Sequence, residues 1–419
     1  MSKRAESPAI PAGIPVPGGR EELESLLGAF IARQPWARSE LGPNARRGLR
    51  TTVVDQVVLR AGRPGLASVV VDAGEPAKSR FQVLLGWRAV SDAAGSELSP
   101  GSVIGTGADA EGEVVLYDAV DDGELALELL SVATGASRSA RRCRVVHSLT
   151  SHASLVFDER LFMKCYRVIE PRPRPEIEML LALDRVGFNH LLAPVGRWAR
   201  KSGDLGLVRE FLPGAVEGKA LALTSLRDLL ARAVTGEDAP TFGALGMAGG
   251  DLGDEMRRLG ETTAEMHLAL AEAFGVSHEA PLPRLRRHGD YHLRRVMRFE
   301  SGWLVAGFGD DPLVSDEAGS SSQGEAKRGF ALEDVADLLV SLTQVAAEAV
   351  DLQPPTTVAH SRQLASGWVA HNARALLNGY FACPGIAELV SLERAAAAAL
   401  LEERVSPRVA GLGLDVKAQ

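Results

Sequence analysis

The stretch that decides the fold is HGDYHLRRVMRFESGWLVAGFGDDP, residues 288–312. It opens with His288, Gly289 and Asp290, and it continues with two short apolar runs, RRVMRF and GWLVAGF, that predict a small hairpin. A carboxylate directly before such a hairpin can accept a proton from an attacking hydroxyl and hold that hydroxyl in line with a γ-phosphate. A His-Gly-Asp tripeptide alone is a weak signal, so its meaning depends on the residues around it.

Two upstream residues strengthen this interpretation. Lys164, in FMKCY, ends a predicted strand, and Glu178 lies on the helix predicted after it. Kinases position a nucleotide phosphate with a lysine that is held by a helix glutamate, so the order of these residues fits phosphoryl transfer. Each also has a plainer interpretation, as a solvated strand-edge lysine and as a surface helix charge. His267, beside Met266 and Leu270 on an amphipathic helix, is predicted to be a packing histidine.

The rest of the chain divides into four segments. Residues 1–19 are rich in Pro, Gly and Ala and predict a flexible, disordered tail. Residues 20–142 combine one helix with short β-branched runs between Gly and Pro turns, which predicts a small twisted sheet. Residues 143–213 follow the pattern strand, strand, helix, strand, strand, and residues 214–419 are mostly helical apart from the hairpin. A β-rich lobe followed by a helical lobe is typical of a kinase-like α+β fold.

The composition argues against several classes of protein. The chain has 54 acidic and 46 basic residues, and no stretch gathers Lys and Arg, so nucleic acid is not an expected partner. Cys143, Cys165 and Cys383 are an odd, widely spaced set that fits a reduced cytoplasm better than a disulfide framework or a zinc site. The N-terminus lacks the apolar core of a signal peptide, and no long uncharged apolar run predicts a membrane segment.

The chain resembles the bacterial maltokinases, and through them the aminoglycoside phosphotransferases, over almost its whole length. LRAGRPGLASVVVD (59–72) and FQVLLGWR (81–88) look like the maltokinase N-terminal cap, and FMKCYRVIEPRPRPEIEMLLAL (162–183) is similar to the lysine strand and glutamate helix. VREFLPGAVEGKALAL (208–223) is similar to the hinge, and LGETTAEMHLALAEAF (259–274) to the helix before the catalytic loop. The resemblance implies a two-lobed protein-kinase-like fold, of the aminoglycoside phosphotransferase type, with an N-terminal β-rich cap.

The resemblance also implies roles for individual residues. Lys164 and Glu178 would position the phosphates of ATP, and Asp290 would be the catalytic base, with His288 beside it in the catalytic motif. The hinge residues that would face adenine through their backbone groups are Arg209, Glu210, Phe211 and Leu212.

Two departures from the family pattern put magnesium binding in doubt. Arg295 stands where the family carries a Gln or Asn that ligates magnesium, and Gly307, Phe308 and Gly309 stand where it reads Asp, Phe, Glu. Magnesium needs hard oxygen ligands, whereas a guanidinium offers five donors and no acceptor. Arg295 therefore cannot coordinate the metal, although it could bind phosphate oxygens itself.

Two further segments leave alternatives open. Asp310 and Asp311 are either replacement metal ligands in a re-registered loop or parts of an ordinary polar turn. Residues 315–329 are either a solvated insertion or a loop that gates the cleft or binds a partner. Maltokinases end with a helix that reads like EKAxYE and forms part of the sugar pocket, whereas this chain has Glu393, Arg394 and then alanines at 395–399, so an eroded acceptor pocket is expected.

Two functional hypotheses follow. The first is a pseudokinase that still binds nucleotide and acts as a regulatory or binding partner, of a sugar or of a protein of trehalose and α-glucan metabolism. The second is an active ATP-dependent kinase of maltose, glucosamine or a similar sugar, with a rearranged metal site. Lys164, Glu178 and Asp290 favour the second hypothesis. The first is favoured by Arg295, Gly307, Gly309 and the alanine run at 395–399. Other nucleotide chemistry on the same fold is a third, less specific alternative.

Overall fold

The computed structural model describes most of the chain. The described residues are 13–41, 48–74, 79–93, 98–147, 151–170, 174–235, 252–300, 302–308 and 328–414. They form two compact units: the first lies within Met1–Arg174 and Pro194–Pro213, and the second within Pro175–Ala193, Gly214–Asp311 and Gly319–Gln419.

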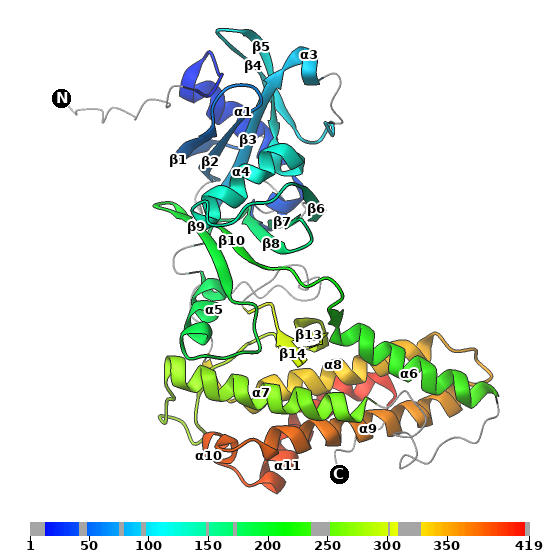
Figure 1. Cartoon of the computed structure of the whole chain (residues 1–419). Coiled ribbons are helices and arrows are strands. Elements are labelled where there is room, and N and C mark those ends of the chain that lie inside the picture. Colours follow the sequence, from blue (N-terminus) through cyan, green and yellow to red (C-terminus); the bar gives the residue numbers. More distant parts are fainter. Residues whose placement is uncertain are drawn as a thin grey trace. The chain divides into compact units, whose positions relative to one another are not determined.

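The first unit is built on two antiparallel sheets of five strands each (Figure 1). The cap sheet has the order β1-β2-β3-β5-β4, and the lobe sheet has the order β6-β7-β8-β10-β9. The cap strands are β1 (Thr51–Arg60), β2 (Gly65–Ala73), β3 (Ser79–Ala89), β4 (Val103–Asp109) and β5 (Gly112–Asp118). The lobe strands are β6 (Cys143–His147), β7 (His152–Phe157), β8 (Leu161–Tyr166), β9 (Pro194–Arg200) and β10 (Gly203–Glu210). The α-helices of this unit are α1 (Gly19–Arg33), α2 (Arg38–Leu41), α3 (Val90–Ala93) and α4 (Gly123–Thr134).

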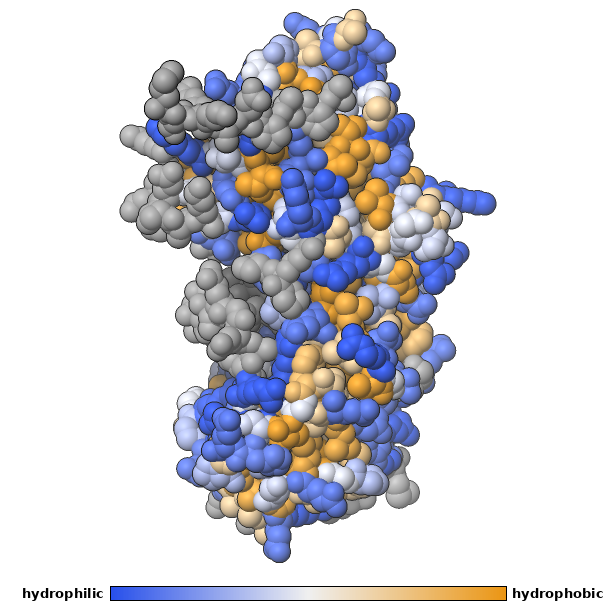
Figure 2. Space-filling model, turned by 90° about the vertical axis from the view of Figure 1, so that its left-hand side faces the viewer, coloured by the Kyte–Doolittle hydropathy of each residue, from blue (hydrophilic) through white to orange (hydrophobic). Residues whose placement is uncertain are grey.

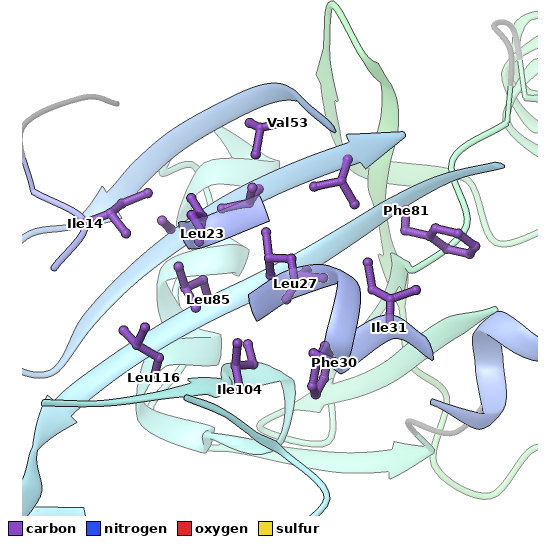
Figure 3. Close-up of a cluster of buried hydrophobic side chains, with 14 of the residues drawn as sticks. Ile14, Leu23, Leu27, Phe30, Ile31, Val53, Phe81, Leu85, Ile104 and Leu116 are labelled. Atoms are coloured by element: carbon purple, nitrogen blue, oxygen red, sulfur yellow. The ribbon is translucent and has the colours of Figure 1, made fainter. Parts of the chain in front are cut away.

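Helix α1 closes the core of the cap. Leu23, Leu27 and Phe30 recur at helical spacing, are fully buried, and point toward sheet residues such as Leu85 and Leu116 (Figure 3). Helix α1 therefore forms one layer, which packs on the predicted sheet.

The same core corrects part of the predicted flexible tail. Ile14 and Val16 are only 8% and 7% exposed and belong to the cap core. Burial of these two apolar side chains holds a Pro- and Gly-rich segment whose composition alone indicated disorder. Residues 1–12 of the predicted tail lie outside the described residues.

Backbone hydrogen bonds and a buried ion pair join the cap to the lobe sheet. The amide of Gln82 in β3 donates to Arg167 O at 2.9 Å, and the amide of Ile169 donates to Arg80 O at 2.9 Å. The Arg167 guanidinium is bidentate on Asp118, at 2.9 and 2.5 Å, and both side chains are buried. Breaking a buried, bidentate pair of this kind is costly, so the cap and the lobe sheet form one unit.

The lobe sheet corrects the predicted strand count. Residues 145–170 were expected to form one hairpin, whereas the structure has three strands, β6, β7 and β8, in this region. Asp158 and Glu159, at φ values of 49° and 53°, make the turn between β7 and β8. Strand β6 has only five residues, so its alternation of apolar and polar residues is too short to separate it from β7.

The second unit is mainly helical. Its helices are α5 (Pro175–Arg185), α6 (Gly218–Thr235), α7 (Gly253–Phe274), α8 (Leu332–Asp351), α9 (Val358–Ala382), α10 (Ile386–Val390) and α11 (Arg394–Val409). Its strands are β11 (Val216–Glu217), β12 (Leu285–Arg286), β13 (Val296–Phe299), β14 (Gly302–Val305) and β15 (Arg328–Gly329). The predicted hairpin is confirmed, because β13 pairs with β14 and Val296 lies opposite Val305.

Helices α7 and α9 pack side by side at two glycines (Figure 1). A Cβ atom at Gly260 would lie 2.0 Å from Leu376 O, and one at Gly379 would lie 1.9 Å from Arg257 O. Only glycine permits this close approach of the two helix backbones.

Polar and apolar residues are intermixed over the coloured part of the face shown in Figure 2. In the described part of the chain, the more exposed large apolar side chains, Val90, Val132, Val146, Val216 and Leu352, lie on or beside five different elements. No helix among the described residues is long and apolar enough to cross a membrane.

Candidate functional site

The predicted catalytic loop lies between β12 and the short 3-10 helix η4 (Leu293–Arg295). Buried residues anchor it: the Tyr291 hydroxyl lies 3.0 Å from Thr263 Oγ1, and the Leu293 amide donates to Ser341 Oγ at 3.1 Å. The Asp290 side chain, in contrast, is 40% exposed. The fold therefore presents this carboxylate on an anchored loop, and its role as a catalytic base stays a prediction.

Asp334, in the first turn of α8, anchors the backbone of the catalytic loop. Its carboxylate accepts hydrogen bonds from the His288 amide at 2.9 Å, the Gly289 amide at 3.1 Å and Arg287 Nη1 at 3.1 Å. His267 Nε2 also lies 3.3 Å from Asp334 Oδ2. Burial by itself raises the pKa of Asp334, but these donors more than offset that effect and hold the pKa below its usual value.

Sequence reasoning missed Asp334, because it reads as one of several acidic residues at a helix start. Its role becomes visible only through the donors that the fold brings to it. His267 was expected to be a packing histidine, and it is fully buried between Asp334 and the Tyr380 hydroxyl, which lies 2.9 Å from Nδ1.

His288 connects the catalytic loop to the segment that follows β14. Its Nδ1 accepts a hydrogen bond from the Asp290 amide at 3.4 Å, so the ring proton lies on Nε2, which donates to Ala306 O at 3.1 Å. Burial lowers the pKa of His288 to about 4. The ring is therefore neutral near pH 7, and its contacts are those of a positioning residue; a direct catalytic role for His288 stays a prediction.

The His288 pKa predicts how stability depends on pH. Because the folded-state pKa is about 4 and the ordinary value is 6.5, the unfolded chain binds more protons between these values. We expect the free energy of unfolding to fall by about 3 kcal/mol as the pH drops from 6.5 to 4, at about 1.4 kcal/mol per pH unit. Urea unfolding at several pH values measures this, and His288→Gln should remove that part of the slope. An unchanged slope in the folded variant would contradict a buried neutral imidazole.

Arg295 is bound directly to the candidate base. Its Nε and Nη2 atoms lie 3.1 and 2.5 Å from Asp290 Oδ2, and its side chain is only 5% exposed. The neighbouring His292 and then Arg295 lower the pKa of Asp290 well below its usual range, although burial opposes them. At 3.5 Å from Asp290 Oδ1, His292 Nε2 is at the limit of a hydrogen bond, so Arg295 makes the firmer contact.

The hairpin register brings Arg295 beside Gly307. The Ala306 amide donates to Arg295 O at 2.8 Å, and Val296 pairs with Val305. A Cβ atom at Gly307, where φ is +71°, would lie 2.7 Å from Arg295 Cδ and 2.8 Å from Nη1. The guanidinium thus fills the space that any side chain at position 307 would enter.

These residues do not fit a magnesium ion. A buried guanidinium occupies the space next to Asp290, and position 307 offers no carboxylate. Within the described ranges, no three His, Cys, Asp or Glu side chains come together as a metal site. Gly309 and the two candidate replacement ligands, Asp310 and Asp311, lie outside the described residues, so their role stays a prediction.

Glu178 is paired inside the second unit. Its Oε2 accepts a hydrogen bond from Arg286 Nη1 at 2.6 Å, and the Arg286 guanidinium lies over the Phe274 ring, 4.4 Å from its centroid. Sequence reasoning missed Arg286, which precedes the catalytic motif by two residues and has no distinguishing pattern of its own. The predicted pairing of Glu178 with Lys164 would join the two units, and it stays a prediction.

Lys164 lies in the middle of the lobe sheet. Strand β8 pairs with β7 on one side and β10 on the other, with Lys164 opposite Ser154 and Leu207. The side chain is buried, with 5% of the residue exposed. The alternative interpretation as a solvated strand-edge lysine is therefore wrong, because β8 is not an edge strand.

The predicted hinge follows β10. Glu210 is exposed, whereas Phe211 and Leu212 are half-buried. The Phe211 amide donates to Arg160 O at 2.8 Å, so this amide is already used within the lobe. The predicted adenine contacts would fall to other backbone groups of the hinge, and they stay a prediction.

The alanine run of the last helix lies at the start of α11. Ala397 is buried, whereas Ala395, Ala396 and Ala399 are exposed. Arg394, at the first position of α11, donates to the Asn378 side chain of α9. These small side chains carry no polar group, and the expected erosion of an acceptor pocket stays a prediction.

Comparisons with known proteins support this fold. Residues 30–122 match the model of the maltokinase N-terminal cap domain. The chain is similar to a structure of glucosamine kinase in complex with glucosamine, ADP and inorganic phosphate, with a TM-score of 0.57 and 18% identity over 93% of this chain and 96% of that chain. It is also similar to crystal form A of glucosamine kinase, with a TM-score of 0.58 and 19% identity over 95% of this chain and 96% of that one.

At these identities the solved structures establish the fold. The matched cap and the matched two-lobed architecture agree with the expected α+β class. Residues 30–122 therefore form a domain similar to the maltokinase N-terminal cap, and the chain as a whole has the kinase-like fold of these structures.

Proposed function

We propose that the chain is a maltokinase-like pseudokinase, which binds nucleotide with little dependence on magnesium and transfers phosphate poorly. The observation that carries the proposal is the Arg295 guanidinium, which is bound to Asp290 and packed against Gly307. It supplies a fixed positive charge where a magnesium-dependent kinase needs oxygen ligands.

His292 and the ion pair with Arg295 together weaken Asp290 as a base. A carboxylate whose pKa is held far below its usual range has little tendency to take a proton from an attacking hydroxyl. Metal stabilisation of the transferring phosphate is worth several kcal/mol, so its loss lowers turnover by orders of magnitude. Both partners of the reaction are therefore affected, the phosphate through the metal and the acceptor through the base.

Calorimetry with ATP, with and without magnesium, tests the proposal. We expect the dissociation constants to differ by less than about tenfold, which corresponds to about 1.4 kcal/mol. Lys164→Met is the control for binding at the lobe, because it removes the charge and keeps most of the buried side-chain volume. Its folding must be checked first, since Lys164 is buried. A strengthening by magnesium of more than tenfold would reject metal-independent binding.

An active sugar or aminosugar kinase is the second candidate. It is favoured by one observation, the 40% exposure of the Asp290 side chain, which leaves part of the carboxylate accessible to an acceptor hydroxyl. A glucosamine kinase among the proteins of similar fold makes an aminosugar the first acceptor to test. A regulatory role in trehalose or α-glucan metabolism rests on the resemblance alone and is part of the proposal.

A further inference from the structure

His292 has a ring orientation that the backbone fixes. It lies at the N-cap of η4, where its Nδ1 accepts a hydrogen bond from the Arg294 amide at 3.2 Å. A ring nitrogen that accepts a hydrogen bond carries no proton. In the neutral ring the proton therefore lies on Nε2, which is the nitrogen that faces Asp290.

The Nε2 atom is a buried donor directed at the candidate base. It lies 3.5 Å from Asp290 Oδ1 and makes no full hydrogen bond within the described part of the chain. The other carboxylate oxygen, Oδ2, is held by Arg295. A buried donor without a partner is unfavourable, and a movement of a few tenths of an ångström would close the bond to Oδ1.

We propose that His292 is a positioning residue for Asp290: its Nε2–H is the second donor to the carboxylate, on the oxygen that Arg295 leaves open. Together the two side chains fix one rotamer of Asp290 and keep it an anion. The inference rests on the metal-independent site proposed above, in which side-chain donors take the place of a bound cation beside the carboxylate. The proposed contact requires no nucleotide.

The charges around the carboxylate support this arrangement. Arg295 is the cation in direct contact with Asp290, and His292 Nε2 lies beside the other carboxylate oxygen. The negative charge of Asp334, on α8, is directed at the loop backbone and is paired with Arg287.

The first test measures the His292 tautomer in the nucleotide-free, wild-type chain. Nitrogen NMR of ¹⁵N-histidine protein distinguishes a protonated ring nitrogen from a bare one. We expect Nε2 protonated and Nδ1 bare, with assignment by comparison with His292→Gln. A proton on Nδ1 would overturn the proposal, because Nε2 could then not donate to Asp290.

The second test follows the Asp290 carboxyl carbon by ¹³C NMR as a function of pH. In His292→Leu, which has no donor, we expect the carboxyl to titrate about one pH unit higher than in the wild type. His292→Gln keeps an N–H donor and should restore most of the difference. An unchanged titration in folded His292→Leu would overturn the proposal.

These two tests are independent of the proposed function. If His292→Leu fails to fold, the tautomer measured in the wild-type chain still tests the proposal. Failure of nucleotide binding in the calorimetry would leave both NMR results unaffected, whereas the wrong tautomer would leave metal-independent binding standing.

Discussion

Magnesium is expected to strengthen ATP binding by the Arg295→Gln/Gly307→Asp double variant about tenfold or more. No such strengthening is expected for the wild-type chain. The double change removes the guanidinium from Asp290 and supplies an amide oxygen and a carboxylate, the ligand types that magnesium prefers. Calorimetry at matched ionic strength, with calcium-free buffers, measures the effect. Equal affinities with and without magnesium would show that the site needs ligands elsewhere.

The two positions should be strongly coupled in stability. Gly307→Asp alone places a Cβ atom 2.7 Å from Arg295 Cδ at a residue with φ of +71°. We expect this single variant to lose about 1–3 kcal/mol of unfolding free energy, as overpacked and left-handed positions do. Adding Arg295→Gln relieves the contact, so the double variant should be more stable than the sum of the single changes predicts. Additive losses in urea unfolding would contradict direct packing of Arg295 on position 307.

Recovery of metal binding should not recover sugar turnover. Transfer also needs a positioned acceptor hydroxyl, and the alanines at the start of α11 offer no polar group to hold one. We expect neither wild type nor double variant to phosphorylate maltose, glucose or glucosamine with magnesium or manganese. Turnover of any of these by the wild-type chain at about 1 per second or more would reject the pseudokinase proposal.

Asp334→Ala is expected to cause the largest loss of stability. It would leave the Arg287 guanidinium without its buried carboxylate and would orphan the amides of His288 and Gly289. Removal of one partner from a buried charge pair costs about 3–5 kcal/mol. Thermal and urea unfolding measure the loss, and the catalytic loop should become disordered in NMR spectra before the helices do.

Asp337→Ala is the matched control on the same helix. Asp337 is 25% exposed and pairs with Arg408, which is 47% exposed, and burial raises its pKa. A partly solvated pair of this kind contributes about 0–1 kcal/mol. Equal losses in the two variants would show that Asp334 is no special anchor of the loop.

The sequence by itself determined the change from a β-rich part to a mainly helical part, the β13–β14 hairpin and the position of Asp290 before it. Hydrophobic periodicity and turn residues are local properties, so they can be read along the chain. It also identified Arg295 and Gly307 as departures from the expected ligands. It could not show that they touch, because their contact depends on the register of a hairpin.

Only the tertiary structure decided which charges meet. It paired Glu178 with Arg286, buried Lys164 in a central strand, and gathered four donors on Asp334. In the structure, Ile14 and Val16 belong to the cap core, although the sequence predicted a tail there. A sequence pattern shows which face of an element is apolar, whereas the partner of a buried charge lies on an element far away in sequence, at a distance that packing alone sets.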